Sequence, residues 1–162
     1  MTGHPGFSLR DARPRDAETV HRLVVALAEY EKLGHEVKAT PQDFYGALAT
    51  KRAQGLIAEA DGEPVGFCLW YETFSTFTGR GGMWIEDVFV DPAYRKLGIG
   101  RAFFRTVAQR AVAAGHARVE WSVLDWNAPA LAFYRRIGAV GLDEWTDQRL
   151  SGEALEALAA EG

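Results

Sequence analysis

Apolar residues in the first third of the chain follow two different periods, which predict one strand and then two helices. Residues 7–12 loosely alternate between apolar and polar side chains, as half-buried strands do. The spacing i, i+3, i+4 then predicts a helix with one buried stripe, made of Val20, Leu23, Val24 and Leu27. Asp16 is its expected N-cap, and Tyr30–Glu31 lies at its C-terminal end before Gly34. Thr40–Pro41, a cap followed by proline, predicts the start of a shorter helix.

Three strands are predicted in the middle of the chain. Leu56–Ala60 and Pro64–Thr73 are expected to pair antiparallel, because Asp61–Gly62 between them accepts the positive φ angles of a tight hairpin. Residues 75–82 are rich in Gly, Ser and Thr and are expected to form a connection. Met83–Val90 is rich in aromatic and β-branched residues, which predicts a buried central strand.

A crossover unit is predicted after this central strand. Apolar residues recur at the helical spacing in Ile99–Ala114, and Gly115 is suited to the left-handed conformation that ends a helix. Arg118–Leu124 follows as the next strand. Strand, helix and strand in this order form a parallel pair joined by a crossover.

The C-terminal part of the chain is expected to hold two helices and two short strands. Asn127 and Pro129 open a helix that runs to Gly138. Short strands are expected around residues 140–142 and 145–150, followed by a final helix rich in Ala, Leu and Glu.

Length and composition indicate one folded domain over residues 1–162, with residues 1–6 loose. The formal net charge of -4 and the absence of a basic stripe disfavour nucleic acid and favour cationic ligands. No apolar run approaches the roughly 20 residues that span a bilayer. We therefore expect no membrane partner, and we expect a cytoplasmic location. The four histidines are scattered, and we expect no metal site. The single Cys68 lies in an apolar run and is interpreted as core filler.

The turn after the central strand has the features of an anion site. It joins Asp91–Pro92 to a helix start through the segment Arg95-Lys96-Leu97-Gly98-Ile99-Gly100. Unpaired N–H groups, the helix dipole and nearby cations would suit a diphosphate. Two glycines alone also make a simple tight turn; the third glycine of a dinucleotide fingerprint and the Gly-Lys-Ser/Thr of a P-loop are absent.

Three separated motifs together resemble the GCN5-related N-acetyltransferase (GNAT) superfamily. They are Arg-x-x-Gly-x-Gly after Val-Asp-Pro, the preceding Glu86–Val90, and Val123–Ala130 with Phe133–Tyr134. Ala28–Glu31, Glu86–Asp87 and Trp126–Asn127 resemble the spermidine/spermine (diamine) acetyltransferase branch. The resemblance spans roughly residues 7–150. It implies an α/β fold of α+β type, in which helices flank a central mixed, mostly antiparallel sheet of six to seven strands containing an acyl-CoA-binding strand–helix–strand unit.

The resemblance also implies a set of site residues. The co-substrate acetyl-CoA would be held by Val88, Phe89, Val90, Arg95, Lys96, Leu97, Gly98, Ile99, Gly100, Arg101, Asn127, Ala130 and Tyr134. Glu86 would accept the proton of the attacking amine, and Tyr134 would donate one to the departing thiolate. The amine would meet Tyr30, Glu31, Glu86, Glu120 and Trp121.

Most of these residues also have a structural interpretation. Glu86 can be a buried carboxylate in an ion pair, with Asp87 on the opposite face by strand alternation as the likelier structural partner. Asn127 is equally suited to capping a helix. Glu31 can be merely solvated and Trp121 merely core. Residues 75–77 lack the acidic and tryptophan residues that polyamine-acetylating relatives carry there.

These observations predict an acetyl-CoA-dependent N-acetyltransferase that acts on a primary amine of a diamine, polyamine or amino-acid-like molecule. Direct attack within a ternary complex needs no acyl-enzyme. The alternatives are a non-catalytic acyl-CoA-sensing module and a protein N-acetyltransferase. Relatives of this branch imply a homodimer.

Overall fold

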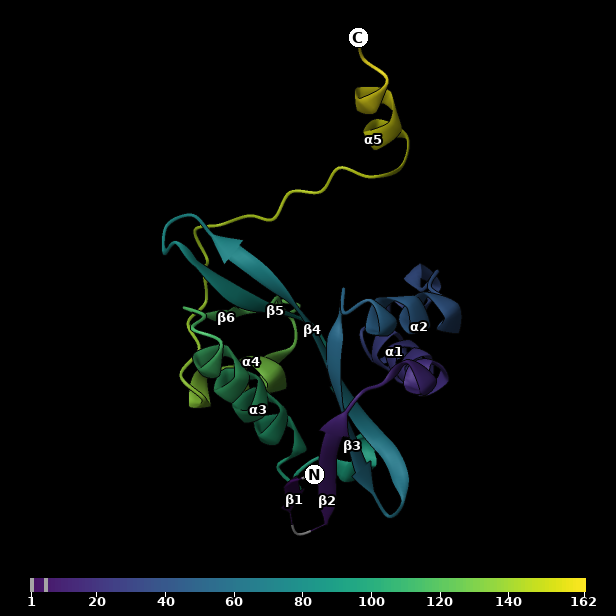
Figure 1. The fold of residues 1–162 in the computed structure, drawn as a ribbon, viewed down its shortest axis with the longest axis vertical. Helices are drawn as coiled ribbons and strands as arrows, with labels where there is room; N and C mark the ends of the chain where they lie inside the picture. The colour runs from purple at the N-terminus through teal and green to yellow at the C-terminus, as the bar shows by residue number, and fades with distance from the viewer. Residues whose placement is uncertain (1, 5) are drawn as a thin grey trace. The chain divides into compact units, whose positions relative to one another are not determined.

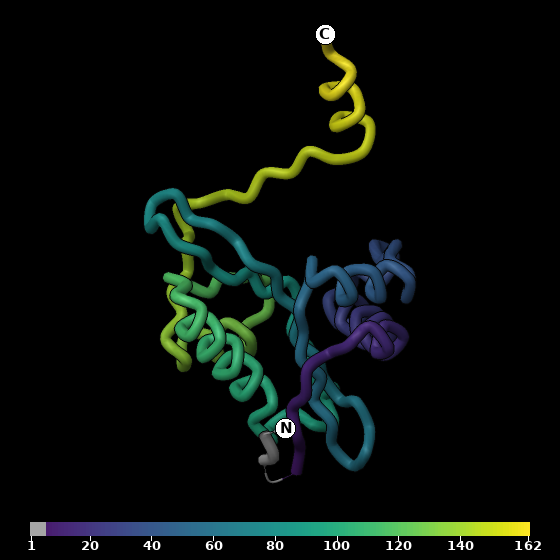
Figure 2. The backbone as a smooth tube through the Cα atoms, viewed as in Figure 1, coloured from purple at the N-terminus to yellow at the C-terminus, as the bar shows by residue number. Residues whose placement is uncertain are grey.

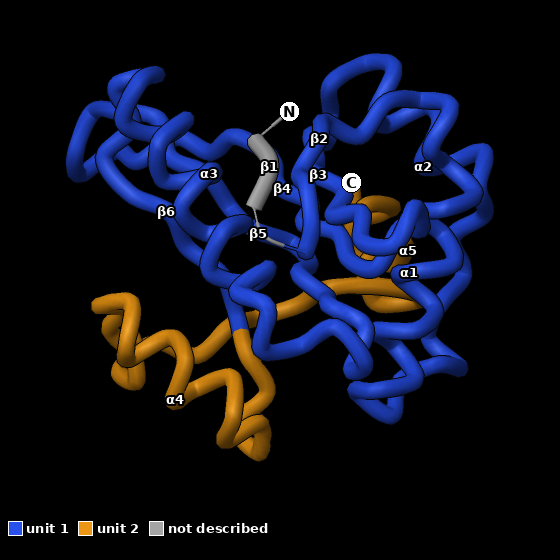
Figure 3. Tube along the Cα trace, turned by 90° about the horizontal axis from the view of Figure 1, so that it is seen from below, with its two compact units in different colours: residues 1–122 blue, residues 123–162 orange. Residues whose placement is uncertain are grey.

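The computed structural model describes residues 2–4 and 6–162, with side chains from residue 6 onward. Within the stretch expected to be loose, Met1 and Pro5 lie outside the described residues, whereas the backbone of Thr2–His4 forms strand β1. The chain divides into two compact units, residues 1–122 and 123–162 (Figure 3). Each unit is described separately below.

The first unit is built on one mixed sheet. Its strands are β1 (Thr2–His4), β2 (Phe7–Asp11), β3 (Gln54–Ala60), β4 (Glu63–Ser75), β5 (Arg80–Val90) and β6 (Val119–Glu120). They lie in chain order across the sheet; β1 to β5 pair antiparallel, and β6 adds parallel to β5 (Figure 1). The mixed, mostly antiparallel sheet expected from the sequence is therefore confirmed, as is the β5–α3–β6 crossover unit.

Hairpins explain the antiparallel part of the sheet. Asp61 and Gly62 take φ angles of 52° and 78°, as their hairpin between β3 and β4 requires. β4 and β5 form a longer hairpin than expected, because pairing continues to Ser75 and Arg80 (Figure 2). The connection predicted for residues 75–82 is thus wrong at both ends, and only residues 76–79 turn.

Helices cover both faces of this sheet. α1 (Ala17–Tyr30) and α2 (Pro41–Ala49) pack against one face, where a core forms from Val20, Leu23, Leu48, Ile57, Phe67, Leu69 and Phe89. Trp70 follows Leu69 and therefore points to the other face, where Arg110 of α3 (Ile99–Ala113) lies 5.5 Å from its ring centre. The predicted helices and the cap at Thr40 are confirmed (Figure 1).

Asp16 has a different task from the one predicted. It occupies the N-cap position of α1, but its carboxylate binds Arg10 at 2.9 Å and accepts the backbone N–H of Arg13 at 2.7 Å. Arg10 also binds Glu59 on β3 at 2.7 Å. Burial raises the pKa of Asp16, but the bonds from Arg10 and Arg13 outweigh burial and hold this pKa below its ordinary value. The carboxylate therefore joins β2, β3 and the start of α1.

The second unit holds α4 (Ala128–Arg136) and α5 (Gly152–Ala159), as expected. The short strands expected around residues 140–142 and 145–150 are not formed. Their residues have no ladder partner among the described residues, and an isolated extended segment is not stabilised as a strand. The strand expected over residues 118–124 is similarly reduced to Val119–Glu120, the pair that meets β5.

None of the helices in the described ranges is long and apolar enough to cross a membrane.

Candidate active site

A β-bulge in β5 places two carboxylates at the middle of the sheet. Ile85 pairs with Trp70 and Asp87 with Leu69, so Glu86 is an extra residue without a partner on β4. Paired residues share a face, so Asp87 lies with Leu69 on the face covered by α1 and α2. The expectation that alternation would separate Glu86 and Asp87 by the thickness of the sheet is wrong, because the bulge interrupts the period of two.

Three carboxylates lie close enough in this region to affect each other. Burial, and then the charges of Glu86 and Glu31, raises the pKa of Asp87 to about 7. Burial also raises the pKa of Glu31, which caps the C-terminus of α1. A cationic ligand would stabilise these three neighbouring carboxylates, and most of all Asp87 and Glu31, whose charge burial disfavours. We call Glu31, Glu86 and Asp87 the acidic cluster.

The carboxylates of Glu86 and Asp87 also affect the pKa values of two residues on β4. Burial and the charge of Glu86 raise the pKa of Tyr71, whose side chain stands on the face of Asp87. Cys68 is fully buried, and burial together with Asp87 raises the pKa of its thiol. A thiol of raised pKa is a poor nucleophile. The interpretation of Cys68 as core filler is confirmed.

The turn between β5 and α3 has the backbone of an anion site. Lys96 and Gly98 take φ angles of 77° and 87°, and Gly98 is the N-cap of α3. Among the described residues, the backbone N–H groups of residues 96–101 have no hydrogen-bond acceptor. A Cβ built on Gly98 would meet nothing within 4 Å, so the space beside these N–H groups is open. Such a group of donors at a helix start favours phosphate.

Arg95 connects this turn with the acidic cluster. Its guanidinium lies 4.7 Å from the ring centre of Tyr30, the last residue of α1, directly before Glu31. Its Nε donates to the carbonyl oxygen of Val90 at 3.1 Å. The structure thus brings the predicted donor-side Arg95 and the predicted acceptor-side Tyr30 into direct contact.

The edge of β5 next to this turn is open. β6 pairs only with Met83 and Trp84, so beyond them the β6 side of β5 has no partner strand in the part of the chain that the structure describes. Val88, Phe89 and Val90 pair with β4 on their other side. The β6 side of Val88 is thus a strand edge without a partner strand among the described residues, whereas the Val90 carbonyl already accepts from Arg95.

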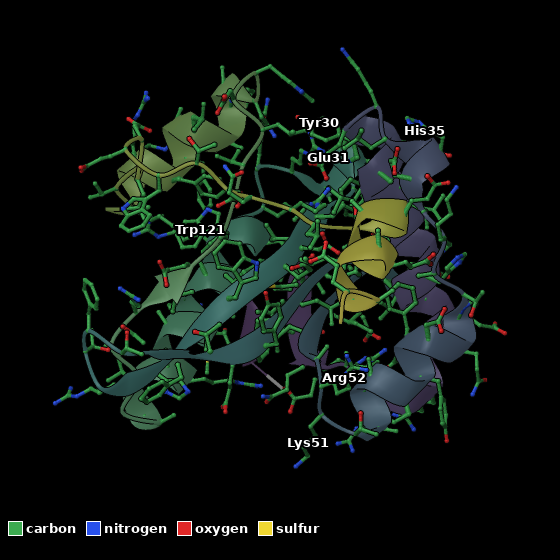
Figure 4. All side chains as sticks on the ribbon, turned by 90° about the horizontal axis from the view of Figure 1, so that it is seen from above. Tyr30, Glu31, His35, Lys51, Arg52 and Trp121 are labelled. Atoms are coloured by element: carbon green, nitrogen blue, oxygen red, sulfur yellow. The ribbon has the colours of Figure 1, made fainter. Side chains whose placement is uncertain are left out.

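Glu120 and Trp121 have partners of their own on the other side of β5. Glu120 binds Arg118 at 3.0 Å. The ring centre of Trp121 lies 4.7 Å from that of Phe104 in edge-to-face geometry, which supports the core interpretation of this tryptophan. In Figure 4 Trp121 lies well apart from Tyr30 and Glu31. Glu120 pairs with Trp84, two residues before Glu86 on the neighbouring strand, and its role toward the substrate stays a prediction.

The second unit carries the remaining predicted residues. Asn127 caps α4, with its side-chain oxygen accepting the N–H of Ala130 at 3.3 Å. The capping alternative for Asn127 is confirmed, and its amide N–H₂ remains able to donate. Tyr134 is half-buried on α4, and its ring centre lies 5.7 Å from that of Phe133.

The residue whose surroundings the sequence interpretation did not anticipate is Asp87. It was given a structural role, yet it is the carboxylate whose pKa lies near neutrality. The signal was present as two adjacent acidic residues on an apolar strand, but a bulge is not visible in the alternation of side chains. The described residues, those of the acidic cluster included, hold no group of three or more His, Cys, Asp or Glu side chains arranged to bind a metal.

The family model described as "Acetyltransferase (GNAT) family" matches residues 18–139. The chain belongs to this family. It is 38% identical over 169 residues to the thialysine N-epsilon-acetyltransferase of Bos taurus, covering 93% of this chain and 96% of that protein. It is 31% identical over 205 residues to the L-ornithine N5-acetyltransferase of Arabidopsis thaliana, covering 97% of this chain and 90% of that protein. The expected enzyme class, N-acetyltransferase, is therefore confirmed for this GNAT protein.

Solved structures share the GNAT fold. An integron cassette protein from the mobile metagenome of V. cholerae superposes with a TM-score of 0.80 at 23% identity, over 98% of this chain and 100% of that chain. This similarity supports the fold that the resemblance implied, a mixed sheet flanked by helices.

Proposed function

We propose that this GNAT protein transfers the acetyl group of acetyl-CoA to a primary amine of a small cationic molecule, a diamine, polyamine or amino-acid-like compound. The observation that carries this proposal is the acidic cluster together with a turn suited to anions, whose Arg95 lies over Tyr30, the residue directly before Glu31. The turn suits the diphosphate of the donor, and the cluster suits the ammonium of the acceptor.

The residues fit acetyl-CoA on two observations. The N–H groups of residues 96–101 and the charges of Arg95, Lys96 and Arg101 surround open space at the start of α3. The free edge of β5 at Val88 offers backbone groups to an extended amide-bearing arm. Bound acetyl-CoA would supply the activated thioester. For Asn127, Ala130 and Tyr134 of the second unit, the roles toward acetyl-CoA that the resemblance implies stay predictions.

Deprotonation of the acceptor amine is the main task of the acidic cluster. An alkyl ammonium with a pKa of about 10.4 is neutral in roughly one molecule in 2,500 at pH 7, a deficit of about 4.6 kcal/mol. Asp87, with its pKa raised to about 7, is ionised in a large fraction of molecules and is still basic enough to accept a proton. We assign Asp87 this role, with Glu86 and Glu31 holding the ammonium. Glu86, the acceptor expected from the resemblance, remains the alternative base.

Tyr134 is proposed to stabilise the departing thiolate. A tyrosine pKa near 10 and a thiol pKa near 8.5 make full proton transfer uphill by about 2 kcal/mol, so a hydrogen bond to the sulfur is its main contribution. The half-buried phenol on α4 is compatible with this task.

A homodimer in the cytoplasm is a further part of the proposal. The second unit exposes large apolar side chains. The exposed fraction is 83% for Val140 and 75% for Trp145. Burying such side chains against a second copy would be favourable. Sedimentation equilibrium should give twice the chain mass, and a monomer at micromolar concentration would contradict this part.

The experiment that tests the function measures free-thiol release from acetyl-CoA over a panel of small amines, together with acetyl-CoA binding by calorimetry. Turnover on primary amines is expected. Binding of acetyl-CoA without turnover on any amine or peptide would contradict the proposal and indicate an acyl-CoA-sensing module. Turnover on peptide amines alone would indicate a protein N-acetyltransferase.

A further inference from the structure

Two aromatic side chains stand beside the acidic cluster on neighbouring strands. Tyr71 of β4 pairs directly with Trp84 of β5. Tyr71 follows Leu69 by two residues, so it shares the face of Leu69 and Asp87, and its partner Trp84 shares that face too. We call Tyr71 and Trp84 the aromatic row. The row and Asp87 therefore lie on the same side of the sheet.

The ring of Trp84 is not committed to the core. Its neighbours along β5, Met83 and Ile85, are buried, whereas Trp84 is only half-buried and Tyr71 is exposed. Among the described residues, no aromatic or cationic side chain contacts the Trp84 ring. Uncovered ring surface beside a charged cluster is suited to the apolar part of a ligand whose charged end lies on that cluster.

An ion pair borders the aromatic row on the β6 side. Glu120 pairs with Trp84 in parallel and shares its face. Its carboxylate binds Arg118 at 3.0 Å. The free surface of the row is therefore aromatic rather than charged, and it is suited to methylene groups.

The distance between the aromatic row and Asp87 matches a short aliphatic chain. Burial, and then the charge of Glu86, raises the pKa of the Tyr71 hydroxyl, which places this phenol close to the acidic cluster. Along β4, Tyr71 and Leu69, the partner of Asp87, are two residues apart, roughly 7 Å. An unbranched chain of about five carbon–carbon bonds covers this distance. A ligand with its ammonium at Asp87 would thus bring the end of such a chain onto the row.

We propose that Trp84 and Tyr71 bind the aliphatic chain of the acceptor, with Trp84 as a specificity-determining residue that selects primary amines by chain length. This inference rests on the proposed acetyltransferase function and adds the residues that bind the part of the acceptor away from the reacting nitrogen. Each methylene that reaches the rings leaves water for an apolar surface, which is favourable. A shorter amine leaves the Trp84 ring uncovered and gains nothing from it.

The test uses unbranched monoamines from n-propylamine to n-hexylamine as acceptors. They carry the same ammonium and differ only in the number of methylene groups. kcat/KM is measured by free-thiol release at saturating acetyl-CoA, and its logarithm is plotted against chain length. For the native protein we expect a rise of up to about fourfold for each methylene that reaches the row, chiefly through KM.

Trp84→Thr removes the ring and keeps a side chain that is favourable in strands. It should reduce the rise to less than about twofold per methylene, whereas Trp84→Phe, with a smaller ring, should keep part of it. Phe77→Thr is the matched control, because Phe77 is 97% exposed in the turn between β4 and β5, and it should keep the native slope. Calorimetry with acetyl-CoA shows whether each variant is folded.

The slope separates binding of the chain from a general loss of activity. A merely structural Trp84 would lower all rates alike, so a native slope in Trp84→Thr would overturn the inference. If Trp84→Thr no longer binds acetyl-CoA, the slope of Trp84→Phe decides in the same way. A flat series in the native protein, or turnover on other amines without any on the monoamines, would also overturn the inference and leave the acetyltransferase in place. Absence of turnover on every amine would overturn the proposed function itself.

Discussion

Asp87 and Glu86 are adjacent in the chain but differ in their surroundings. Asp87 is paired within the sheet and partly buried, and burial raises its pKa to about 7; Glu86 is the exposed bulge residue. A proton acceptor works best with a pKa near the working pH, and a site for an ammonium works best with a charged carboxylate. This difference in environment favours a division of labour between the two.

The first prediction concerns the pH dependence of the reaction. In the native protein kcat/KM should rise through a limb near pH 7 as Asp87 loses its proton. Asp87→Asn should remove that limb and lower kcat about 10²- to 10⁴-fold, the usual worth of a general base. Steady-state rates between pH 5.5 and 9 measure it.

Glu86→Gln is the matched comparison for this prediction. The charge of Glu86 is one cause of the raised pKa of Asp87, so its removal should move the limb to lower pH and leave it in place. If instead Glu86→Gln abolishes the limb and Asp87→Asn keeps it, the base is Glu86.

Tyr134 gives a second prediction at this scale. Tyr134→Phe removes only the hydroxyl, so kcat should fall about tenfold or more while the affinity for acetyl-CoA stays within about twofold. Rates with a panel of acyl thioesters and calorimetry measure the two effects. Equal rates in variant and native protein would remove the leaving-group assignment.

At the scale of elements, the β5–α3 turn and the β5 bulge are the features that build the site. The turn was predictable, because glycines, cations and a helix start are readable in the chain from Arg95 to Arg101. The bulge was not, because an extra residue leaves no mark on a run such as Ile85–Val90, and its consequence for Asp87 was therefore missed. Tertiary pairing also explains why the strands expected over residues 140–142 and 145–150 are not formed. Their local sequence pattern favours strands, but no described strand lies beside them to pair with.

The acceptor side shows the same limit on prediction. Tyr30 and Glu31 were placed correctly at the end of α1, because helix periodicity fixes where the helix ends. Trp121 was expected nearby but packs with Phe104, whereas Glu120 binds Arg118 and pairs with Trp84, two residues before Glu86. Which strand ends converge depends on the twist and length of a sheet, and a single sequence does not state either.

The turn supplies a third prediction. Gly98 has a φ of 87° and open space beside it, so Gly98→Ala should strain the backbone by about 1–2 kcal/mol and place a methyl where we propose the diphosphate binds. Acetyl-CoA affinity should fall at least tenfold by calorimetry. Gly79→Ala, at a φ of 63° in the β4–β5 hairpin with equally open space, is the control for strain alone. Equal affinities in both variants would place the diphosphate elsewhere.

For the whole molecule, two buried carboxylates influence the stability of the fold with opposite signs. The pKa of Asp16 is lowered in the fold, so its contribution is present above the unfolded value of about 3.9 and is lost as the pH falls through the native value. The pKa of Asp87 is raised, so its penalty to the fold grows as the pH rises from about 3.9 to 7 and stays constant above that. The first unit therefore holds the Asp87 carboxylate at a cost in stability, while Asp16 helps to hold β2, β3 and α1 together.

The last prediction follows from these signs. The melting temperature of the native protein should be highest in acidic solution near pH 4, fall as the pH rises towards 7 and level off above it. Asp87→Asn should remove that fall; the difference between 7 and the ordinary 3.8 sets an upper limit of about 4 kcal/mol for the gain at pH 8. Asp16→Asn should destabilise the protein at neutral pH, and this loss should shrink in strong acid. Thermal melts across pH 3–9 measure all three proteins. A merely structural Asp87 would lower the melting temperature when replaced, so a variant that is both slower and more stable identifies a carboxylate held there for the reaction.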